Sequence, residues 1–234
     1  MSAAARPEAE AALRKLDPDV SRETLAALEA LVETLLKWQK AINLVGPATL
    51  GDVWSRHIVD SAQLLPLIPA AAKSLADLGS GAGFPGLVLA AMRPELDVIL
   101  IESDARKAAF LGEAGRRMGQ AGGLKKQPKI VIGRVEAVAP AGADVVTARA
   151  LAPLGQLLVW ADRHRSDPAI CLFHKGKDWQ VELTDARRGW DISVQHFPSA
   201  TDRDAVLLRI GDYRPRDDPG AADIRDSQSK GRRR

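Results

Sequence analysis

A glycine-rich turn between two apolar runs places the tightest constraint on how this chain can fold. The strand-like run Leu75 to Leu78 is followed by four glycines and then by the apolar run Leu87 to Met92. The glycines are Gly79, Gly81, Gly83 and Gly86. This order predicts a strand, a turn and a helix. Because glycine adopts positive φ and lets a ligand approach the backbone, the turn is predicted to hold a nucleotide-like ligand.

Strand-like and helix-like runs alternate through the middle of the chain. The predicted strands are Leu75 to Leu78, Val98 to Glu102, Ile130 to Gly133, Asp144 to Thr147 and Ile170 to His174. The predicted helices are Gly86 to Met92, Ala105 to Met118 and Leu154 to Arg163. This alternation predicts an α/β fold with a parallel sheet covered on both faces, whose ligand site lies at the carboxyl ends of the strands.

The two ends of the chain depart from this alternation. Apolar residues at helical spacing predict a helical appendage over residues 21–70. Two strand-like runs without a helix between them, Ile192 to Phe197 and Ala205 to Ile210, predict an antiparallel hairpin at the sheet edge. We therefore expect a seven-stranded, mostly parallel sheet over 71–213, a flexible N-terminus over 1–20 and a disordered basic tail over 214–234.

The composition excludes several classes of protein. The 234 residues, 46% of them hydrophobic, suffice for one α/β domain with an appendage. The single cysteine, Cys171, excludes a disulfide within the chain, and the histidines lack metal-ligand spacing, so we predict no metal site. No run approaches the roughly 20 apolar residues of a membrane span, and we expect a cytoplasmic protein without a membrane partner. The net charge of +3 is compatible with a nucleic-acid partner without requiring one.

Two classes of cofactor use a turn of this kind. The segment Gly81 to Gly86 matches the G-x-G-x-x-G fingerprint of NAD-binding proteins, and Glu102 follows at a strand end, where a carboxylate can accept ribose hydroxyls. In a dinucleotide site, however, the first fingerprint glycine follows the strand directly. That position is Gly79 here, and the match that starts there has Phe84 in place of the third glycine. The register of the turn therefore argues against NAD.

Asp77 lies two residues before Gly79 and gives the pattern Asp-x-Gly-x-Gly-x-Gly. This pattern resembles the first motif of S-adenosylmethionine (AdoMet) methyltransferases. In that class the glycine loop lies against the methionine end of the cofactor, and the carboxylate of Glu102 fits the group that holds the ribose diol. The turn together with Asp77 therefore favours AdoMet as the cofactor.

A series of segments in one order resembles the bacterial RsmG (GidB) family, the ribosomal RNA small subunit methyltransferases G. They are Lys37-Trp38, Ile42 to Leu44, Arg56 to Ser61, Asp77 to Gly86, Glu102-Ser103, Gly133 to Glu136, Thr147 to Ala150 and Lys175-Gly176. The resemblance runs from about residue 21 to 213 and implies the class I, Rossmann-like methyltransferase fold. It also implies methyl transfer from AdoMet to N7 of the guanosine at position 527, in the 530 loop of 16S ribosomal RNA in the 30S subunit.

The resemblance also implies which residues contact the cofactor. They are Gly79, Gly81 and Phe84 in the turn, Glu102 at the ribose, Val135 and Glu136 at the adenosine part, and Arg149 at the end nearest the substrate. Guanine N7 carries a lone pair and no proton, so the implied reaction needs no general base. We therefore expect no catalytic dyad, and we expect catalysis to come from holding the reacting atoms in line.

Four basic residues are candidates for positioning the substrate. Arg149 is predicted to orient the target base or the methionine carboxylate through its planar donors, with a strand-end ion pair as the alternative. Arg56 and His57 are predicted to contact RNA phosphate or the cofactor edge, or else to cap a helix or pack between layers. Lys175, at the end of its strand, is predicted to meet a phosphate.

Other functions remain open on the sequence alone. One is an AdoMet methyltransferase that acts on a small molecule or a protein. A second is an NAD-dependent oxidoreductase, and a third is a noncatalytic ribosome-assembly module that keeps the pocket only for stability.

Overall fold

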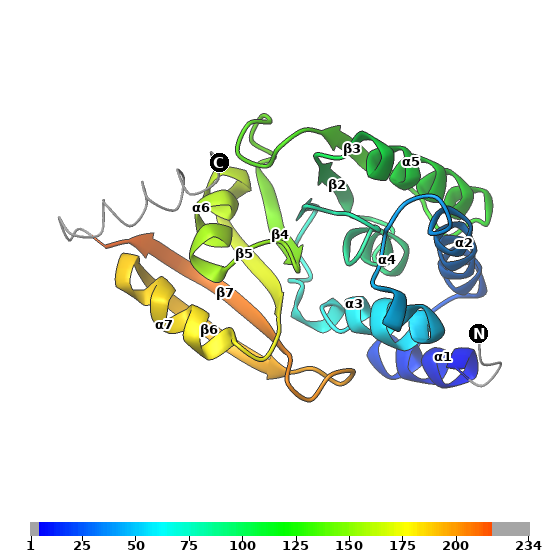
Figure 1. Ribbon diagram of the computed structural model, residues 1–234, viewed down its shortest axis with the longest axis horizontal. Helices are drawn as coiled ribbons and strands as arrows, with labels where there is room; N and C mark the ends of the chain where they lie inside the picture. Colours follow the sequence, from blue (N-terminus) through cyan, green and yellow to red (C-terminus); the bar gives the residue numbers. More distant parts are fainter. Residues whose placement is uncertain (1–4, 217–234) are drawn as a thin grey trace.

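A computed structural model describes residues 5–216 and places a seven-stranded sheet at the centre of the molecule (Figure 1). The strands are β1 (Ser74–Leu78), β2 (Asp97–Glu102), β3 (Lys129–Ile132), β4 (Ala143–Arg149), β5 (Arg165–Lys175), β6 (Trp190–Pro198) and β7 (Val206–Pro215). Their order is β3-β2-β1-β4-β5-β7-β6. The first five pair in parallel, whereas β7 pairs antiparallel with both β5 and β6. The predicted parallel sheet with an antiparallel hairpin is confirmed, and the predicted tail lies almost entirely outside the described residues.

Helices cover both faces of this sheet. They are α1 (Ala5–Leu16), α2 (Arg22–Trp38), η1 (Pro47–Asp52), η2 (Trp54–Val59), α3 (Asp60–Ala62), η3 (Leu65–Leu67), α4 (Gly86–Met92), α5 (Ala105–Gln120), α6 (Leu154–His164) and α7 (Trp179–Gly189). The helices α1, α2, α4 and α5 lie on one side of the sheet, and α6 and α7 on the other (Figure 1).

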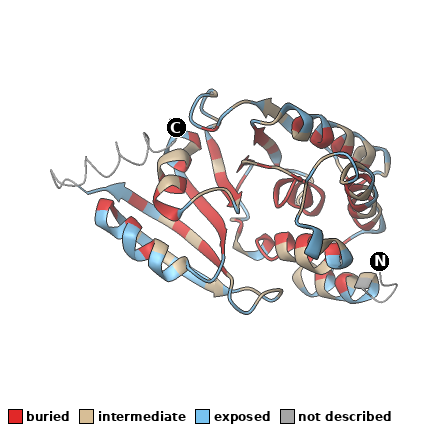
Figure 2. Ribbon diagram, in the orientation of Figure 1, coloured by how far each residue is buried: buried red, intermediate tan, exposed pale blue. Residues whose placement is uncertain are grey.

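Side chains that alternate along the strands build a core on each face. On β5, Leu172 belongs to the cluster under α4 and α5, whereas Cys171 and Phe173 belong to the cluster under α6 and α7. The strands β1, β2, β4 and β5 are consequently buried along most of their length, whereas the edge strands β3 and β6 are mostly partly exposed (Figure 2). Burial raises the pKa of the Cys171 thiol to about 12, as expected for a packed cysteine without reactivity.

Polar side chains fix where two of the longer helices begin. Ser21 caps α2, because its hydroxyl accepts a hydrogen bond from the Thr24 N–H at 3.0 Å. Asp104 caps α5 in the same way, accepting from the Arg106 N–H at 2.8 Å. Because of the second cap, only Ser103 and Asp104 lie between the end of β2 and the start of α5, which keeps that connection short at the rim where the functional site lies.

The expectation of a flexible N-terminus is wrong for most of that segment. Residues 5–16 form α1, in which Leu13 is fully buried and Ala9 is 4% exposed. The two residues are four apart, so they lie on one face of the helix, and that face packs against the neighbouring turn η2. The chain is ordered there because this apolar stripe is covered by tertiary contacts.

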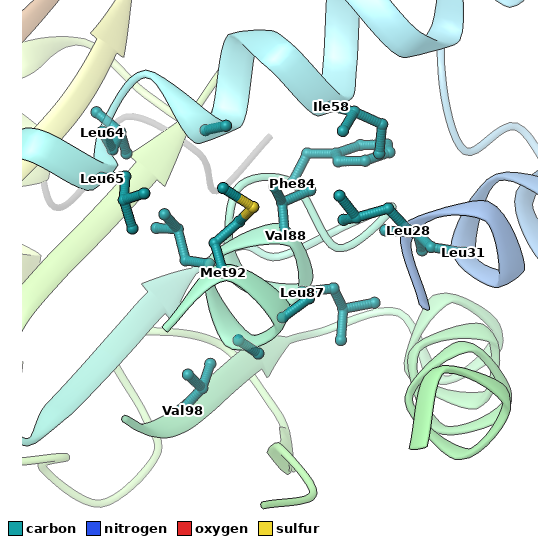
Figure 3. Packing of buried hydrophobic residues seen from close by; sticks show 14 of the residues in the cluster. Leu28, Leu31, Ile58, Leu64, Leu65, Phe84, Leu87, Val88, Met92 and Val98 are labelled. Carbon is teal, nitrogen blue, oxygen red and sulfur yellow. The ribbon is translucent and has the colours of Figure 1, made fainter. Parts of the chain in front are cut away.

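The N-terminal helices and the sheet share one core. Leu28 of α2 and Ile58 of η2 meet Phe84 and Val88, which lie in and just after the glycine turn (Figure 3). The helical layer before β1 therefore packs directly on the turn that carries the predicted cofactor residues.

Candidate active site

The order of the strands identifies the position of the candidate site. From β1 the chain continues to β2 on one side of the sheet, and from β4 it continues to β5 on the other side. The chain therefore leaves the neighbouring strands β1 and β4 in opposite directions. This reversal of direction opens a crevice at the carboxyl ends of β1 and β4, where ligands of open α/β sheets bind. Two loops leave the sheet there: residues 79–85 after β1 and residues 150–153 after β4.

The loop after β1 is held in a conformation that requires glycine. Gly79, Gly81 and Gly83 have φ values of +64°, +54° and +81°, which L side chains rarely adopt. A Cβ on Gly81 would meet nothing closer than the Gly79 carbonyl oxygen at 3.8 Å, so the backbone is open to a ligand there. A Cβ on Gly79 would instead overlap the side chain of Leu151, because the two loops pack against each other.

Asp77 anchors this loop from beneath. One carboxylate oxygen accepts a hydrogen bond from the Thr147 hydroxyl of β4 at 2.8 Å, and the other accepts from the Gly86 N–H of α4 at 3.3 Å. The side chain is fully buried, and burial raises its pKa to about 6. Asp77 therefore joins β1, β4 and α4 and does not itself face a ligand.

Glu102 supports the same loop from the next strand. Its carboxylate accepts hydrogen bonds from the N–H groups of Gly81 and Asp104, both at 2.8 Å. The carboxylate oxygens keep further lone pairs. A buried carboxylate beside an open glycine backbone fits the ribose and methionine parts of AdoMet, so the residues present are compatible with this cofactor.

The two predicted adenosine contacts follow β3 on the same rim. Val135 is buried, and its carbonyl oxygen is hydrogen bonded to His164 Nε2 at 2.8 Å, whereas the side chain of Glu136 is exposed. The structure thus brings Gly81, Glu102 and Val135 to the ends of neighbouring strands. Their contacts with a cofactor stay predictions.

Phe84 lies where the glycine turn meets the other half of the site. Its side chain is 4% exposed and packs among the core residues of Figure 3. The His57 ring stacks on it with centroids 5.0 Å apart, and the Arg149 guanidinium carbon lies 5.1 Å from its centroid. Phe84 therefore joins the predicted cofactor loop to the predicted positioning residues.

Arg149 is held by several groups at the end of β4. Its Nη1 lies 3.2 Å from Asp60 Oδ2 and donates to the Arg56 carbonyl oxygen at 3.3 Å. Its Nη2 contacts His57 Nδ1 at 2.9 Å. The ion pair at the strand end, which was the alternative prediction for Arg149, is present. The side chains of Arg149 and Asp60 are, however, only 18% and 14% exposed. This ion pair is a partly buried arrangement inside the site and not a surface pair.

The contact with Arg149 fixes the state of the His57 ring. A guanidinium can only donate, so His57 Nδ1 accepts and Nε2 carries the proton toward Thr49 Oγ1 at 2.8 Å. Burial, together with the positive charge of Arg149, lowers the pKa of His57 to about 4. His57 is therefore neutral at physiological pH, and its predicted role in positioning the substrate stays a prediction.

A cleft of about 750 Å³ lies beside this network. Its walls come from residues 44–49, from Arg56 to Asp60, from the loop after β4, from the end of β5 and from the β6–β7 loop. Such a volume is typical of pockets for small ligands and accommodates a nucleobase. The sequence did not predict that the β6–β7 loop forms one wall, because the contacts that place it there are long-range.

Two of the predicted RNA-contacting residues have partners within the protein. Lys175 Nζ donates to the Ala152 carbonyl oxygen at 2.7 Å and pairs with Glu182 at 2.5 Å, and the residue is 8% exposed. Arg56 donates to the Thr201 carbonyl oxygen at 2.8 Å and pairs with Asp202 at 3.0 Å. In this structure Lys175 supports the loop after β4, and Arg56 ties the N-terminal layer to the β6–β7 loop.

Within residues 5–216, no cluster of three or more histidine, cysteine, aspartate or glutamate side chains has the arrangement of a metal site. None of the helices described here combines the length and the apolar character that crossing a bilayer requires.

Comparison with known proteins gives consistent matches. The family model described as rRNA small subunit methyltransferase G matches residues 24–206. Two proteins named Ribosomal RNA small subunit methyltransferase G are among the similar sequences. The one from Paramagnetospirillum magneticum is 53% identical over 82% of this chain and 90% of its own length, and the one from Rhodospirillum centenum is 51% identical over 84% and 88%.

Solved structures of methyltransferases share the fold. A SAM dependent methyltransferase from Aquifex aeolicus has a TM-score of 0.52 at 17% identity, with 75% of this chain and 96% of the other covered. Cofactor-bound Rv0187 from MTB has a TM-score of 0.51 at 17% identity, with 88% and 96% covered. At this level of identity the likeness supports the fold alone.

Proposed function

The chain belongs to the rRNA small subunit methyltransferase G family, and we propose that it transfers a methyl group from AdoMet to N7 of one guanosine in the 530 loop of 16S ribosomal RNA. The observation that carries the proposal is the family match over residues 24–206, which spans most of α2, the short helices before β1, the glycine turn and the Arg149 cleft together. A ribosomal substrate also supports the proposal of a cytoplasmic location.

The geometry supports a division of the site into two halves. We assign the cofactor to the rim formed by the glycine turn, Glu102 and residues 135–136. Glu102 is suited to accept hydrogen bonds from ribose hydroxyls, and Gly81 leaves the backbone free for close approach. When bound, AdoMet supplies an electrophilic methyl group on a sulfonium. The cleft next to Phe84 and Arg149 then takes the acceptor base.

The acceptor half is suited to positioning rather than to proton transfer. His57 is neutral and both of its ring nitrogens have protein partners, so it is not placed to act as a base. The guanidinium of Arg149 has five N–H donors. Its contacts with Asp60 and the Arg56 carbonyl involve Nη1, and its contact with His57 involves Nη2, so the Nε–H and one N–H of Nη2 are left. We propose that its remaining donors hold an oxygen of the substrate, which fixes the base without engaging the N7 lone pair.

A labelling experiment tests this function. The protein is incubated with tritiated AdoMet and, in separate reactions, with 30S subunits from a strain that lacks the modification, with naked 16S ribosomal RNA and with 50S subunits. We expect label in the 30S subunits or the naked RNA, recovered as 7-methylguanosine from the 530-loop fragment, and none in the 50S control. Binding of AdoMet without label in any RNA would contradict the proposal, and the two positive arms separate assembled subunit from free RNA as substrate.

A further inference from the structure

Asp60 joins three elements of the site through one side chain and its own carbonyl group. Its Oδ2 lies 3.2 Å from Arg149 Nη1 at the end of β4, and its Oδ1 accepts a hydrogen bond from the Thr201 hydroxyl at 2.6 Å. Its backbone oxygen is hydrogen bonded to His174 Nε2 of β5 at 2.9 Å. The side chain is 14% exposed and lines the cleft.

The Arg149 guanidinium needs the charge of Asp60. Its side chain is 18% exposed, and a cation withdrawn from water to this extent requires a counter-charge and hydrogen-bond acceptors. Asp60 supplies the carboxylate, while the Arg56 carbonyl and His57 Nδ1 are neutral acceptors. These three acceptors fix the plane of the guanidinium beside the Phe84 ring.

The other oxygen of Asp60 fixes the outer wall of the cleft. Thr201 belongs to the β6–β7 loop, whose residues Ser199 and Asp202 line the cleft. Gln63 strengthens the same junction, because its Oε1 accepts from the Ala200 N–H at 2.6 Å. The Asp60 carboxylate thus holds in place both the Arg149 guanidinium and the β6–β7 loop, which faces Arg149 across the cleft.

We propose that Asp60 is a positioning residue for methyl transfer. It holds the Arg149 guanidinium against Phe84 and holds the β6–β7 loop across the cleft, so that the acceptor base meets walls that are already in place. This inference rests on the proposed function. It makes Asp60 necessary for rate through its contacts with other residues, without contact with the reacting atoms.

Asp144 provides a matched control at the opposite end of β4. Its Oδ2 accepts hydrogen bonds from the N–H groups of Lys73 and Ser74 at 2.8 Å and 3.0 Å, and from the Ser74 hydroxyl at 3.0 Å. Like Asp60 it is an aspartate that joins separate segments, but it lies at the amino end of the strand, away from the cleft. A change there reports the cost of a lost structural carboxylate alone.

The test compares Asp60→Asn with Asp144→Asn in the full-length protein. Methyl transfer to 30S subunits is measured at saturating AdoMet, below the unfolding temperature of each variant, and AdoMet affinity is measured by calorimetry. We expect Asp60→Asn to lower kcat by about 10- to 100-fold, because misplacement of a positioning group by about an ångström has this effect. AdoMet affinity should change little, and Asp144→Asn should keep the kcat of the wild type.

A double variant shows whether Asp60 acts through Arg149. If it does, the double variant with Asp60→Asn and Arg149→Ala has a kcat no lower than that of Arg149→Ala alone. If the fold-losses of the two single variants multiply in the double variant, Asp60 does not act through Arg149. A wild-type kcat in Asp60→Asn would overturn the whole inference. An inactive wild type in the same assay would instead contradict the proposed function, which keeps the two failures distinguishable.

Thr201→Val tests the contact with the loop should Asp60→Asn fail to fold. Thr201 is half-buried, and valine keeps its shape while it removes the hydroxyl that donates to Asp60. We expect the KM for 30S subunits to rise several-fold with a folded, AdoMet-binding protein. An unchanged KM would overturn the role of Asp60 in holding this loop.

Discussion

At the scale of single residues, the site depends on how Arg149 is held. Asp60, the Arg56 carbonyl and His57 surround its guanidinium, and Phe84 lies beside it. A planar donor group fixed in this way can orient a base, whereas a flexible lysine in the same place cannot make the same set of bonds.

Substitution of Arg149 should therefore reduce the rate of methyl transfer. We expect Arg149→Lys and Arg149→Ala both to lower kcat at saturating AdoMet by about 100-fold. Lysine keeps the positive charge, but it lacks the planar set of donors that a guanidinium provides. Arg149→Ala should also cost about 3 kcal/mol of stability, since it leaves Asp60 without its partner. Urea unfolding and single-turnover labelling measure the two effects.

Arg117→Ala is the control, because Arg117 pairs with Glu33 at 3.1 Å on the surface between α2 and α5, away from the cleft. It should leave kcat unchanged. Turnover of Arg149→Ala equal to that of Arg117→Ala would refute the role of Arg149.

The lowered pKa of His57 predicts a specific dependence of the free energy of unfolding on pH. An unfolded chain protonates this histidine near pH 6.5, but burial keeps the folded ring neutral down to about pH 4. The contribution of the neutral ring to stability is therefore complete above pH 6.5 and is lost as the pH falls toward 4. The free energy of unfolding of the wild type should fall relative to that of His57→Gln between pH 7 and pH 5, as measured in urea. A difference that stays constant over this range would show that the folded pKa of His57 is not lowered.

At the scale of elements, the sequence predicted those with a strong period and missed those with a weak one. The strands β1, β2 and β4 contain short, largely buried apolar runs next to turn residues, and α4 begins and ends as predicted. The helices α1 and α7 were missed, because their apolar stripes are short and interrupted by charged residues. In α7 only Leu183 and Ala186 are buried apolar residues, so neighbouring elements determine its helical state.

The order of α1 is testable through its buried leucine. Leu13 is fully buried, so Leu13→Ala should lower the free energy of unfolding by about 2–4 kcal/mol through lost burial and a residual cavity. Glu8→Ala, at an exposed position of the same helix, should change it by less than about 0.5 kcal/mol. Equal, small effects in chemical denaturation would indicate that the N-terminus is flexible after all.

The contact between β5 and α7 gives Lys175 partners within the protein, while its predicted contact with an RNA phosphate stays a prediction. Its ammonium pairs with Glu182 and supports the loop after β4, so Lys175→Met should lower thermal stability without removing an RNA phosphate contact. The slope of log Kd for 30S subunits against log salt should therefore match that of the wild type. A slope reduced by about one would mean that Lys175 does meet a phosphate.

At the scale of the whole molecule, the site combines segments that lie far apart in the sequence. The sequence predicted the glycine turn and Glu102, because each ends a strand of recognisable pattern, whereas Arg149 was predicted from the family resemblance. The outer wall of the cleft was not predicted, since it depends on bonds such as that between Asp60 and Thr201, which are 141 residues apart. Pairings over such distances carry no local signal and emerge only when the N-terminal layer packs on the sheet.

The most direct test of the central claim is the mass of the 530-loop fragment of 16S ribosomal RNA in cells. A bacterium deleted for its own enzyme of this family is supplied with this chain or with its Arg149→Ala variant, and the fragment is analysed by mass spectrometry. With this chain we expect a fragment that is heavier by one methyl group, located on N7 of a guanosine, and with the variant we expect a largely unmodified fragment. An unmodified fragment in cells that contain the folded wild-type protein would contradict it.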